Sequence, residues 1–230
     1  MKALNIIAKW LFVLCLPALL LSASIGWAVN SLWLYERGFE KYHISRTTGL
    51  SDTELEKAAR GLISYFNSSE ELIDISVEKD GQPLTLFNER EVSHLKDVKD
   101  LFWLDYKIFF GTLIYVLAYG GVYFFWRRPR YWRQLARLML IGSGITLGIM
   151  LALWVGSLIN FDQLFMQFHL LSFSNDFWQL DPSRDYLLML FPEGFWYDAT
   201  LFIALGATVM AIVLGILSGG HLLFNKNDLV

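Results

Sequence analysis

The chain contains 230 residues with a net charge of −3, and 55% of its residues are hydrophobic while only 18% are charged. A soluble domain typically has about 25% charged residues and about 45–50% apolar residues. The apolar excess therefore excludes an ordinary water-soluble core, a disordered chain and a basic protein that binds nucleic acid. The single cysteine also excludes a scaffold held by intramolecular disulfides.

The apolar residues gather in four blocks, each long enough to cross a bilayer as a helix of about 20 residues. These blocks are residues 10–34, 108–126, 138–159 and 199–217. The first begins like a signal peptide, with Lys2 and Lys9 before the apolar run, but that run is too long for a typical cleaved signal. We predict a mainly α membrane protein with four transmembrane helices and a small α+β extracellular cap.

Basic residues near the ends of these blocks predict the orientation of the chain. The segments expected in the cytoplasm carry a net charge of +7, whereas the two expected outside carry −5 each. Because cytoplasmic loops are enriched in Lys and Arg, both termini are expected in the cytoplasm. The predicted organisation is a first transmembrane helix (1–34), an extracellular cap (35–107), transmembrane helices two and three joined by a basic cytoplasmic loop (108–159), a second, aromatic-rich extracellular segment (160–198), and a fourth helix with a cytoplasmic tail (199–230).

The first outer segment has the signals of a small folded unit. Ser51 and Glu54 match a capping box, and the apolar residues that follow recur at helical spacing. Alternating apolar residues on both sides of Asp80-Gly81 predict a β-hairpin. Asn88 can cap a last helix, with Glu91 at the reciprocal position, and this helix is expected to run into the second span.

The second outer segment is filled with aromatic residues, among which acids and His169 are interleaved. Trp and Tyr commonly form a belt at the membrane interface, which is one interpretation of this segment. Polar residues at membrane depth usually line a pocket or a path. We therefore favour a lipid-facing active pocket built from this segment.

Two of the four histidines are the candidate catalytic residues, namely His94 and His169, one from each outer segment. On a helix, Glu91 and Asp97 are the i−3 and i+3 neighbours of His94, and a carboxylate there can orient an imidazole. The alternative is a solvated, charged helix face. A metal site using His94, His169 and an acid is also left open.

Other catalytic motifs are incomplete or absent. Glu91-x-x-His94 matches part of a di-iron motif whose remaining ligands are missing, and no Gly-x-Ser-x-Gly elbow or phosphate loop occurs. Gly144 and Gly148 lie within the third apolar block and predict close helix packing there. The inventory supports proton transfer on a substrate that supplies its own nucleophile.

Five stretches together resemble a known family. They are residues 48–52 (TGLSD), 87–99 (FNEREVSHLKDVK), 168–178 (FHLLSFSNDFW), 180–187 (LDPSRDYL) and 191–196 (FPEGFW). In this order and spacing they resemble the lipoprotein intramolecular transacylases, an integral membrane family of Gram-positive bacteria. The resemblance covers nearly the whole chain.

The resemblance implies an activity and a location. Enzymes of this family act on diacylglyceryl lipoproteins at the outer face of the bacterial cell membrane, with membrane lipids around them and without a cofactor. They move the sn-2 acyl chain to the α-amine of the N-terminal cysteine, which gives a lyso-form lipoprotein. Two catalytic histidines at the interface of cap and membrane match His94 and His169, and no protein partner is implied.

The residues themselves fit this chemistry, since one imidazole can take a proton from the attacking amine and another can give one to the leaving oxygen. From position alone, Glu91 and Asp97 are candidates for orienting His94. Asn175, Trp178 and Asp181 are candidates for shaping the pocket or stabilising an oxyanion. The competing hypotheses are a metal-dependent membrane lipid or peptide hydrolase and a non-enzymatic lipid-binding membrane module.

Overall fold

The computed structural model describes residues 2–126 and 129–224, which fall into two compact units. The bundle unit consists of Met1–Gly26, Asp105–Val155 and Phe202–Val230, and the polar unit consists of Trp27–Leu104 and Gly156–Leu201. Part of the predicted basic loop, Arg127 and Arg128, and the predicted tail residue Lys226 lie outside the described residues.

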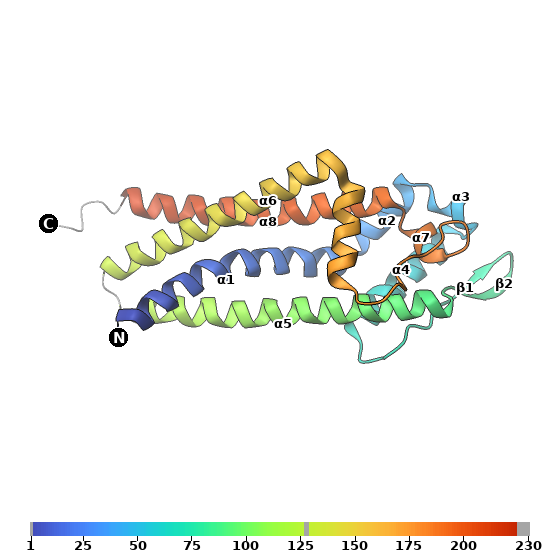
Figure 1. Ribbon diagram of the computed structural model, residues 1–230, viewed down its shortest axis with the longest axis horizontal. Coiled ribbons are helices and arrows are strands. Elements are labelled where there is room, and N and C mark those ends of the chain that lie inside the picture. Colours follow the sequence, from blue (N-terminus) through green and yellow to red (C-terminus); the bar gives the residue numbers. More distant parts are fainter. Residues whose placement is uncertain (1, 127–128, 225–230) are drawn as a thin grey trace. The chain divides into compact units, whose positions relative to one another are not determined.

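Four long helices supply the bundle unit and continue into the polar unit (Figure 1). They are α1 (Lys2–Val29), α5 (Glu89–Trp126), α6 (Pro129–Ser172) and α8 (Glu193–Phe224). Each is long and apolar enough to cross a membrane, and each contains one of the four predicted blocks or most of it. The first block is corrected at its end, because α1 stops at Val29 and Ser31 is already the N-cap of the next helix.

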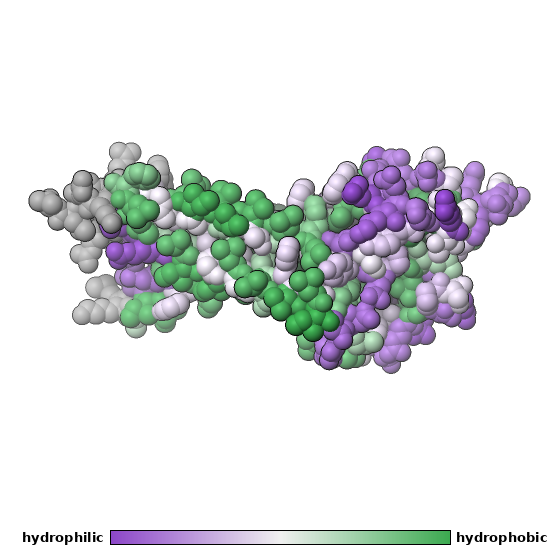
Figure 2. Space-filling view, turned by 90° about the horizontal axis from the view of Figure 1, so that it is seen from above, coloured by the Kyte–Doolittle hydropathy of each residue, from purple (hydrophilic) through white to green (hydrophobic). Residues whose placement is uncertain are grey.

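The bundle unit packs through small and aliphatic side chains. Leu16 of α1 and Ala211 of α8 share one buried cluster, and Met150 of α6 packs with Ala204 and Ala207 of α8 in another. Small residues let apolar helices approach closely where no water is present to drive their association. Large apolar side chains remain on the outside, and Figure 2 shows this hydrophobic surface over the bundle unit.

The polar unit contains the short elements of the chain, and Figure 2 shows a largely hydrophilic surface over it. These elements are α2 (Leu32–Lys41), α3 (Ile44–Thr48), α4 (Asp52–Asn67), β1 (Ser76–Lys79), β2 (Gln82–Thr85) and α7 (Tyr186–Leu190). The predicted helix after Ser51 is confirmed, since the Ser51 hydroxyl accepts a hydrogen bond from the Glu54 amide and Leu55, Ala58 and Leu62 are buried.

The predicted β-hairpin is also confirmed. Strands β1 and β2 pair antiparallel, with Val77 opposite Leu84. Asp80 and Gly81 both have positive φ, as a two-residue type I′ turn requires. The Glu54 carboxylate accepts a hydrogen bond of 2.8 Å from the Glu78 amide, which ties the hairpin to the start of α4.

A break in α6 sets the direction of the segment that carries His169. Asn160 leaves the helical conformation, with φ −162° and ψ 90°, and the ribbon of α6 changes direction sharply (Figure 1). The Asn160 side chain accepts a hydrogen bond of 3.0 Å from the Gln163 amide, so it caps the part of the helix that follows. The sequence placed Asn160 at the start of an outer segment, and the structure makes it the start of a new helical run.

Candidate functional site

All seven predicted site residues lie in the polar unit. His94 comes from α5 and His169 from α6, and their rings stack with centroids 6.1 Å apart and planes inclined by 30°. Two residues 75 positions apart in the sequence thus form a facing imidazole pair. His43 and His221 are not part of it, because His43 lies between α2 and α3 and His221 near the end of α8.

Four aromatic rings surround the pair, and we call them the aromatic cage: Phe165, Phe168, Phe173 and Trp178. The Phe165 ring lies 4.4 Å from the His169 ring, and the Trp178 ring lies 5.0 Å from it, between centroids. Phe173 contacts both imidazoles, at 5.1 Å from His94 and 5.6 Å from His169. Such packing fixes the ring planes, and it keeps water away from the face that each imidazole presents to the cage.

A backbone contact assigns the tautomer of His169. Its Nδ1 lies 2.8 Å from the Phe165 carbonyl oxygen, which can only accept a hydrogen bond. Nδ1 therefore carries a proton, and in the neutral ring Nε2 is the nitrogen that can accept one.

His94 is held differently. Only 7% of it is exposed, and its Nδ1 has no hydrogen-bond partner among the described residues. A buried polar atom without a partner is uncommon, because it loses its hydrogen bonds to water. This unpartnered nitrogen belongs to one of the two facing imidazoles.

Asp97 lies one helical turn after His94, and its charge acts on the His94 ring. The Asp97 Oδ2 accepts a hydrogen bond of 2.8 Å from the side-chain amide of Asn175, in the loop that follows α6. The structure thus brings two of the predicted supporting residues together next to the pair. Their predicted roles in orientation and in shaping the pocket stay predictions.

Glu91 is almost completely buried, with 1% of its surface exposed, and its carboxylate binds two backbone amides. One oxygen accepts from the Asn88 amide at 2.8 Å, as the predicted cap of α5 requires, and the other accepts from the Leu187 amide at 2.7 Å. These contacts join the start of α5 to α7. Its predicted role in orienting His94 stays a prediction, and the contacts that the structure gives it are structural.

Asp181 lies farther from the pair, in an exposed turn. Its Oδ1 accepts hydrogen bonds from the amide and the hydroxyl of Ser183, which lower the pKa of this carboxyl below its ordinary value. Its backbone amide donates to Asp185 at 2.7 Å, and Asp185 also accepts from the Asn88 side chain at 2.9 Å. Asp181 therefore belongs to a hydrogen-bonded chain beside the start of α5.

Sequence reasoning missed two kinds of residue here. It did not single out Phe165 or Phe173, because an aromatic-rich segment gives no sign of which rings will face a histidine. It also missed Asp185, which is 7% exposed and links Asn88 to Asp181. The only available signal for Asp185 was its position just before a short apolar run.

The metal site left open by the sequence finds no set of ligands in the described part of the chain. Within residues 2–126 and 129–224, no three His, Cys, Asp or Glu side chains gather closely enough to hold a metal ion. The described part of the site is thus a pair of imidazoles with carboxylates held by other partners.

These features define a class: an integral membrane protein with helices apolar enough to span the bilayer and a polar unit that carries two facing imidazoles in an aromatic cage. The model of the family described as lipoprotein intramolecular transacylase Lit matches residues 10–196. The chain therefore belongs to the lipoprotein intramolecular transacylase (Lit) family.

Similar proteins agree with this membership. A structure of the membrane integral lipoprotein intramolecular transacylase Lit from Bacillus cereus superposes with a TM-score of 0.79 and 19% identity, over 98% of this chain and 99% of that one. Two structures of the same protein with a substituted histidine give TM-scores of 0.76 and 0.77 at 20% identity. At these identities the likeness shows a shared fold.

A relative that is similar in sequence has no described function. An uncharacterized protein of Aquifex aeolicus (strain VF5) is 34% identical over 136 residues, which are 57% of this chain and 54% of that protein. The chain thus spans about half the length of the curated relative it matches.

Proposed function

We propose that this protein transfers an acyl chain within a diacylglyceryl lipoprotein, from the sn-2 oxygen of the glyceryl group to the α-amine of the N-terminal cysteine. The observation that carries the proposal is the stacked pair His94 and His169 inside an aromatic cage, in a chain that belongs to the Lit family. The product is an N-acylated lipoprotein with a lyso-glyceryl group.

The reaction needs two proton movements, and the pair supplies a group for each. As the amine nitrogen attacks the ester carbonyl, a C–N bond forms and the nitrogen loses a proton to a base. The bond between the acyl carbonyl carbon and the sn-2 oxygen then breaks, and the leaving oxygen, which stays on the glyceryl group, takes a proton from an acid. Because nucleophile and ester belong to one molecule, the protein has mainly to orient them, and good orientation contributes about 7–11 kcal/mol.

The tautomer of His169 supports its assignment as the base. With Nδ1–H donated to the Phe165 carbonyl, Nε2 of the neutral ring has a lone pair for the proton of the amine. His94 then gives a proton to the leaving oxygen, and the proton that His169 took from the amine replaces it, so both rings end the cycle as they began. The aromatic cage suits a lipid substrate, since apolar rings favour the glyceryl and acyl groups over water.

The proposed orientation of the chain in the membrane rests on the distribution of charge along the sequence. The segments predicted outside are acidic and those predicted inside are basic, so we propose that both termini lie in the cytoplasm and that the imidazole pair works at the outer membrane interface. Lipoproteins and membrane lipids are the proposed partners, and no cofactor is proposed.

The test is conversion of a diacylglyceryl reporter lipoprotein in cells with and without this protein. Substrate and product have the same mass, so fragmentation in the mass spectrometer must locate the acyl chain. His94→Ala and His169→Ala are each expected to abolish conversion. His43→Asn is the matched control, because His43 is exposed, lies outside the pair and has a positive φ that Asn tolerates.

The outcomes separate the competing functions. Full conversion by either alanine variant would overturn the assigned role of that histidine. Loss of activity in chelator with recovery on adding one metal would favour the metal-dependent hydrolase. Substitutions of both histidines that have no effect, together with an effect of Trp178→Ala, would favour a lipid-binding module.

A further inference from the structure

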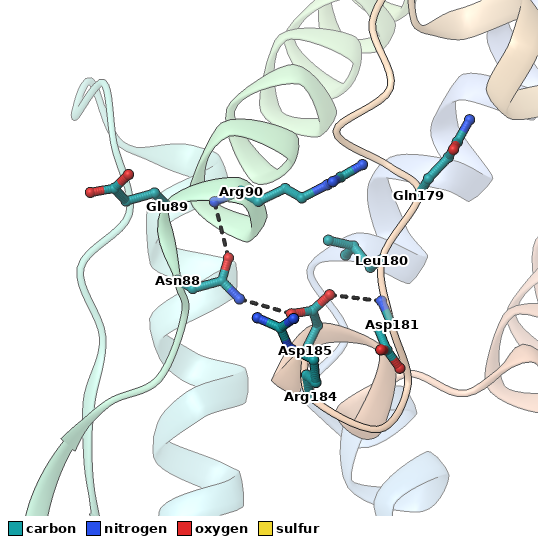
Figure 3. A pocket seen from close by; sticks show the side chains of 8 residues that line it. All are labelled: Asn88, Glu89, Arg90, Gln179, Leu180, Asp181, Arg184 and Asp185. Carbon is teal, nitrogen blue, oxygen red and sulfur yellow. Dashed lines mark hydrogen bonds between the residues drawn. The ribbon is translucent and has the colours of Figure 1, made fainter.

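Two adjoining cavities lie in the polar unit beside the start of α5. The larger, of about 570 Å³, is lined by residues that include Asn88, Arg184 and Asp185 (Figure 3). The smaller, of about 470 Å³, is lined by residues that include Ser93 and Asn175. Both cavities are lined by Glu89 and Arg90, so they adjoin, and we call the two together the polar groove.

The polar groove begins next to the imidazole pair. Ser93, in the smaller cavity, directly precedes His94 on α5. Phe177, in the same cavity, directly precedes Trp178, whose ring packs on His169. The groove thus runs from the edge of the aromatic cage toward the N-terminal end of α5.

Its floor is built by the hydrogen-bonded chain described above. In Figure 3 the side chain of Asn88 and the backbone amide of Asp181 both bind the buried carboxylate of Asp185. The Arg90 side chain extends from α5 toward the segment that carries Gln179, and its guanidinium donates to the Asp176 carbonyl at 2.6 Å. Three separate stretches of chain are therefore fixed around the groove.

Two other charged groups at the groove make no hydrogen bond or ion pair within the part of the chain that the structure describes, although the charge of Arg184 acts on Asp181. Among the described residues, the Arg184 guanidinium makes no hydrogen bond or ion pair, and neither does the Glu89 carboxylate. A ligand can therefore use them without displacing an internal contact.

The chemistry of the lining selects the kind of ligand. Arginine guanidiniums and side-chain amides donate hydrogen bonds, while Glu89, Asp181 and Asp185 accept them. A peptide backbone offers donors and acceptors in alternation and fits such a lining. A phosphate would meet three carboxylates beside two arginines, and an acyl chain would leave these polar groups unpaired.

The proposed reaction places a peptide at this position. The amine that receives the acyl chain and the carbonyl that starts the rest of the polypeptide are bonded to the same carbon of the N-terminal cysteine. The next residue must therefore lie about 3.5 Å further along the chain from the cysteine whose amine the imidazole pair contacts. We propose that the polar groove binds the extended peptide segment that follows the acylated cysteine of the substrate lipoprotein, an inference that rests on the proposed function.

The test compares how the full-length protein converts two synthetic substrates in phosphatidylcholine vesicles. The long one is a diacylglyceryl-cysteine peptide of eight residues in total, and the short one is the methylamide of diacylglyceryl-cysteine. The wild type is expected to have a higher kcat/KM for the long substrate than for the short one. Arg184→Ala is expected to reduce this preference about tenfold, because the variant has a higher KM for the long substrate. Arg60→Ala is the matched control, since Arg60 is exposed on α4 and pairs with Glu56.

Three results would overturn the proposal that the polar groove binds the substrate peptide. The first is a wild type that converts both substrates with the same kcat/KM. The second is an equal loss of kcat/KM on both substrates in Arg184→Ala. The third is an effect of Arg184→Ala on kcat/KM that changes with the fraction of phosphatidylglycerol added to the vesicles. The last result would indicate a lipid headgroup site.

Binding can be tested apart from catalysis. A photoreactive amino acid at Gln179, in the wild type and in His94→Ala, is expected to crosslink a reporter lipoprotein within its first residues after the cysteine. The same amino acid at Glu56 on α4 serves as the control. Absence of a Gln179 crosslink would reject peptide binding in the groove even if acyl transfer occurs, whereas failure to convert either substrate with the Gln179 crosslink intact would reject only the proposed function.

Discussion

The side-chain amide of Asn175 donates a hydrogen bond of 2.8 Å to the carboxylate of Asp97. This contact joins the loop after α6 to α5, one helical turn beyond His94. Asn175 Oδ1 also accepts from the Phe177 amide at 3.0 Å, so one residue anchors the loop and holds the Asp97 carboxylate. The two elements that carry the imidazoles are thereby linked on one side of the pair.

Asn175→Ala is expected to lower kcat about tenfold with a smaller change in KM, because the Asp97 carboxylate loses its partner and the loop loses its anchor. Asp97→Ala should have a similar effect. If both act through this one bond, the double variant will be no slower than the slower single variant. Additive losses would show that the two residues act separately.

Glu91→Gln is expected to destabilise the polar unit by about 1–3 kcal/mol, because an amide has only one acceptor oxygen for the two backbone amides that the carboxylate binds. Thermal unfolding in detergent measures this loss. Glu56→Gln on the exposed face of α4 is the control. A variant of Glu91 that keeps its melting temperature but loses kcat would instead support the predicted role in orienting His94.

The sequence predicted the elements well and their meeting point less well. Capping residues, the Asp80-Gly81 turn and apolar periodicity act over a few residues, so the helix after Ser51, the hairpin and the start of α5 could be read directly. The Asp97–Asn175 bond and the Phe173 contacts join residues far apart in the chain, and no local pattern encodes them. His94 and His169 were chosen by their chemistry, not by any sign of proximity.

The predicted position of close helix packing is wrong. Gly144 and Gly148 were predicted to allow it, but among the described residues a Cβ at either position would meet no atom beyond its own stretch of helix within 4 Å. The close contact occurs at Gly142, where a Cβ would lie 2.8 Å from the Leu16 side chain and 3.2 Å from the Val13 carbonyl oxygen. Spacing identifies a face of small residues, but which face meets a neighbour depends on the rotation of the helix in the bundle.

Tyr65 is expected to make stability depend on pH in the alkaline range. Burial, with the charges of Asp100, Glu70 and Glu71, raises the pKa of Tyr65 from 10.0 to about 12. A folded-state pKa above the unfolded value means that this contribution is fully present below pH 10 and is lost as the pH rises toward 12. The free energy of unfolding should fall over this window.

Tyr65→Phe provides the check. At neutral pH it should lose about 1 kcal/mol, because the hydroxyl no longer donates to the Glu71 carbonyl. Denaturant unfolding at a series of pH values should then show a shallower decline above pH 10 than in the wild type. An identical slope in both proteins would contradict the assignment to Tyr65.

Gly38→Ala is expected to destabilise the packing of α2 on the start of α8. A Cβ at Gly38 would overlap the buried Phe195 ring, at 2.6 Å from one of its carbons and closer still to another. Overpacking of this kind typically costs about 1–3 kcal/mol. Gly111→Ala, where no atom lies within 4 Å of the added carbon, is the control, and equal melting temperatures for the two variants would contradict the close contact.

Phe173 is the cage residue whose ring contacts both imidazoles, at 5.1 Å and 5.6 Å between centroids. Removal of this ring frees both imidazoles to rotate, so Phe173→Ala is expected to lower kcat about 10- to 100-fold, as small misplacements of reacting groups do. Phe173→Leu should recover part of this loss, because it restores volume without the ring contacts. Leu171→Ala, at a side chain that is 86% exposed on the same segment, is the control for folding and insertion. A Phe173→Ala variant with wild-type kcat would show that the imidazoles are held by α5 and α6 alone and that the cage serves the substrate.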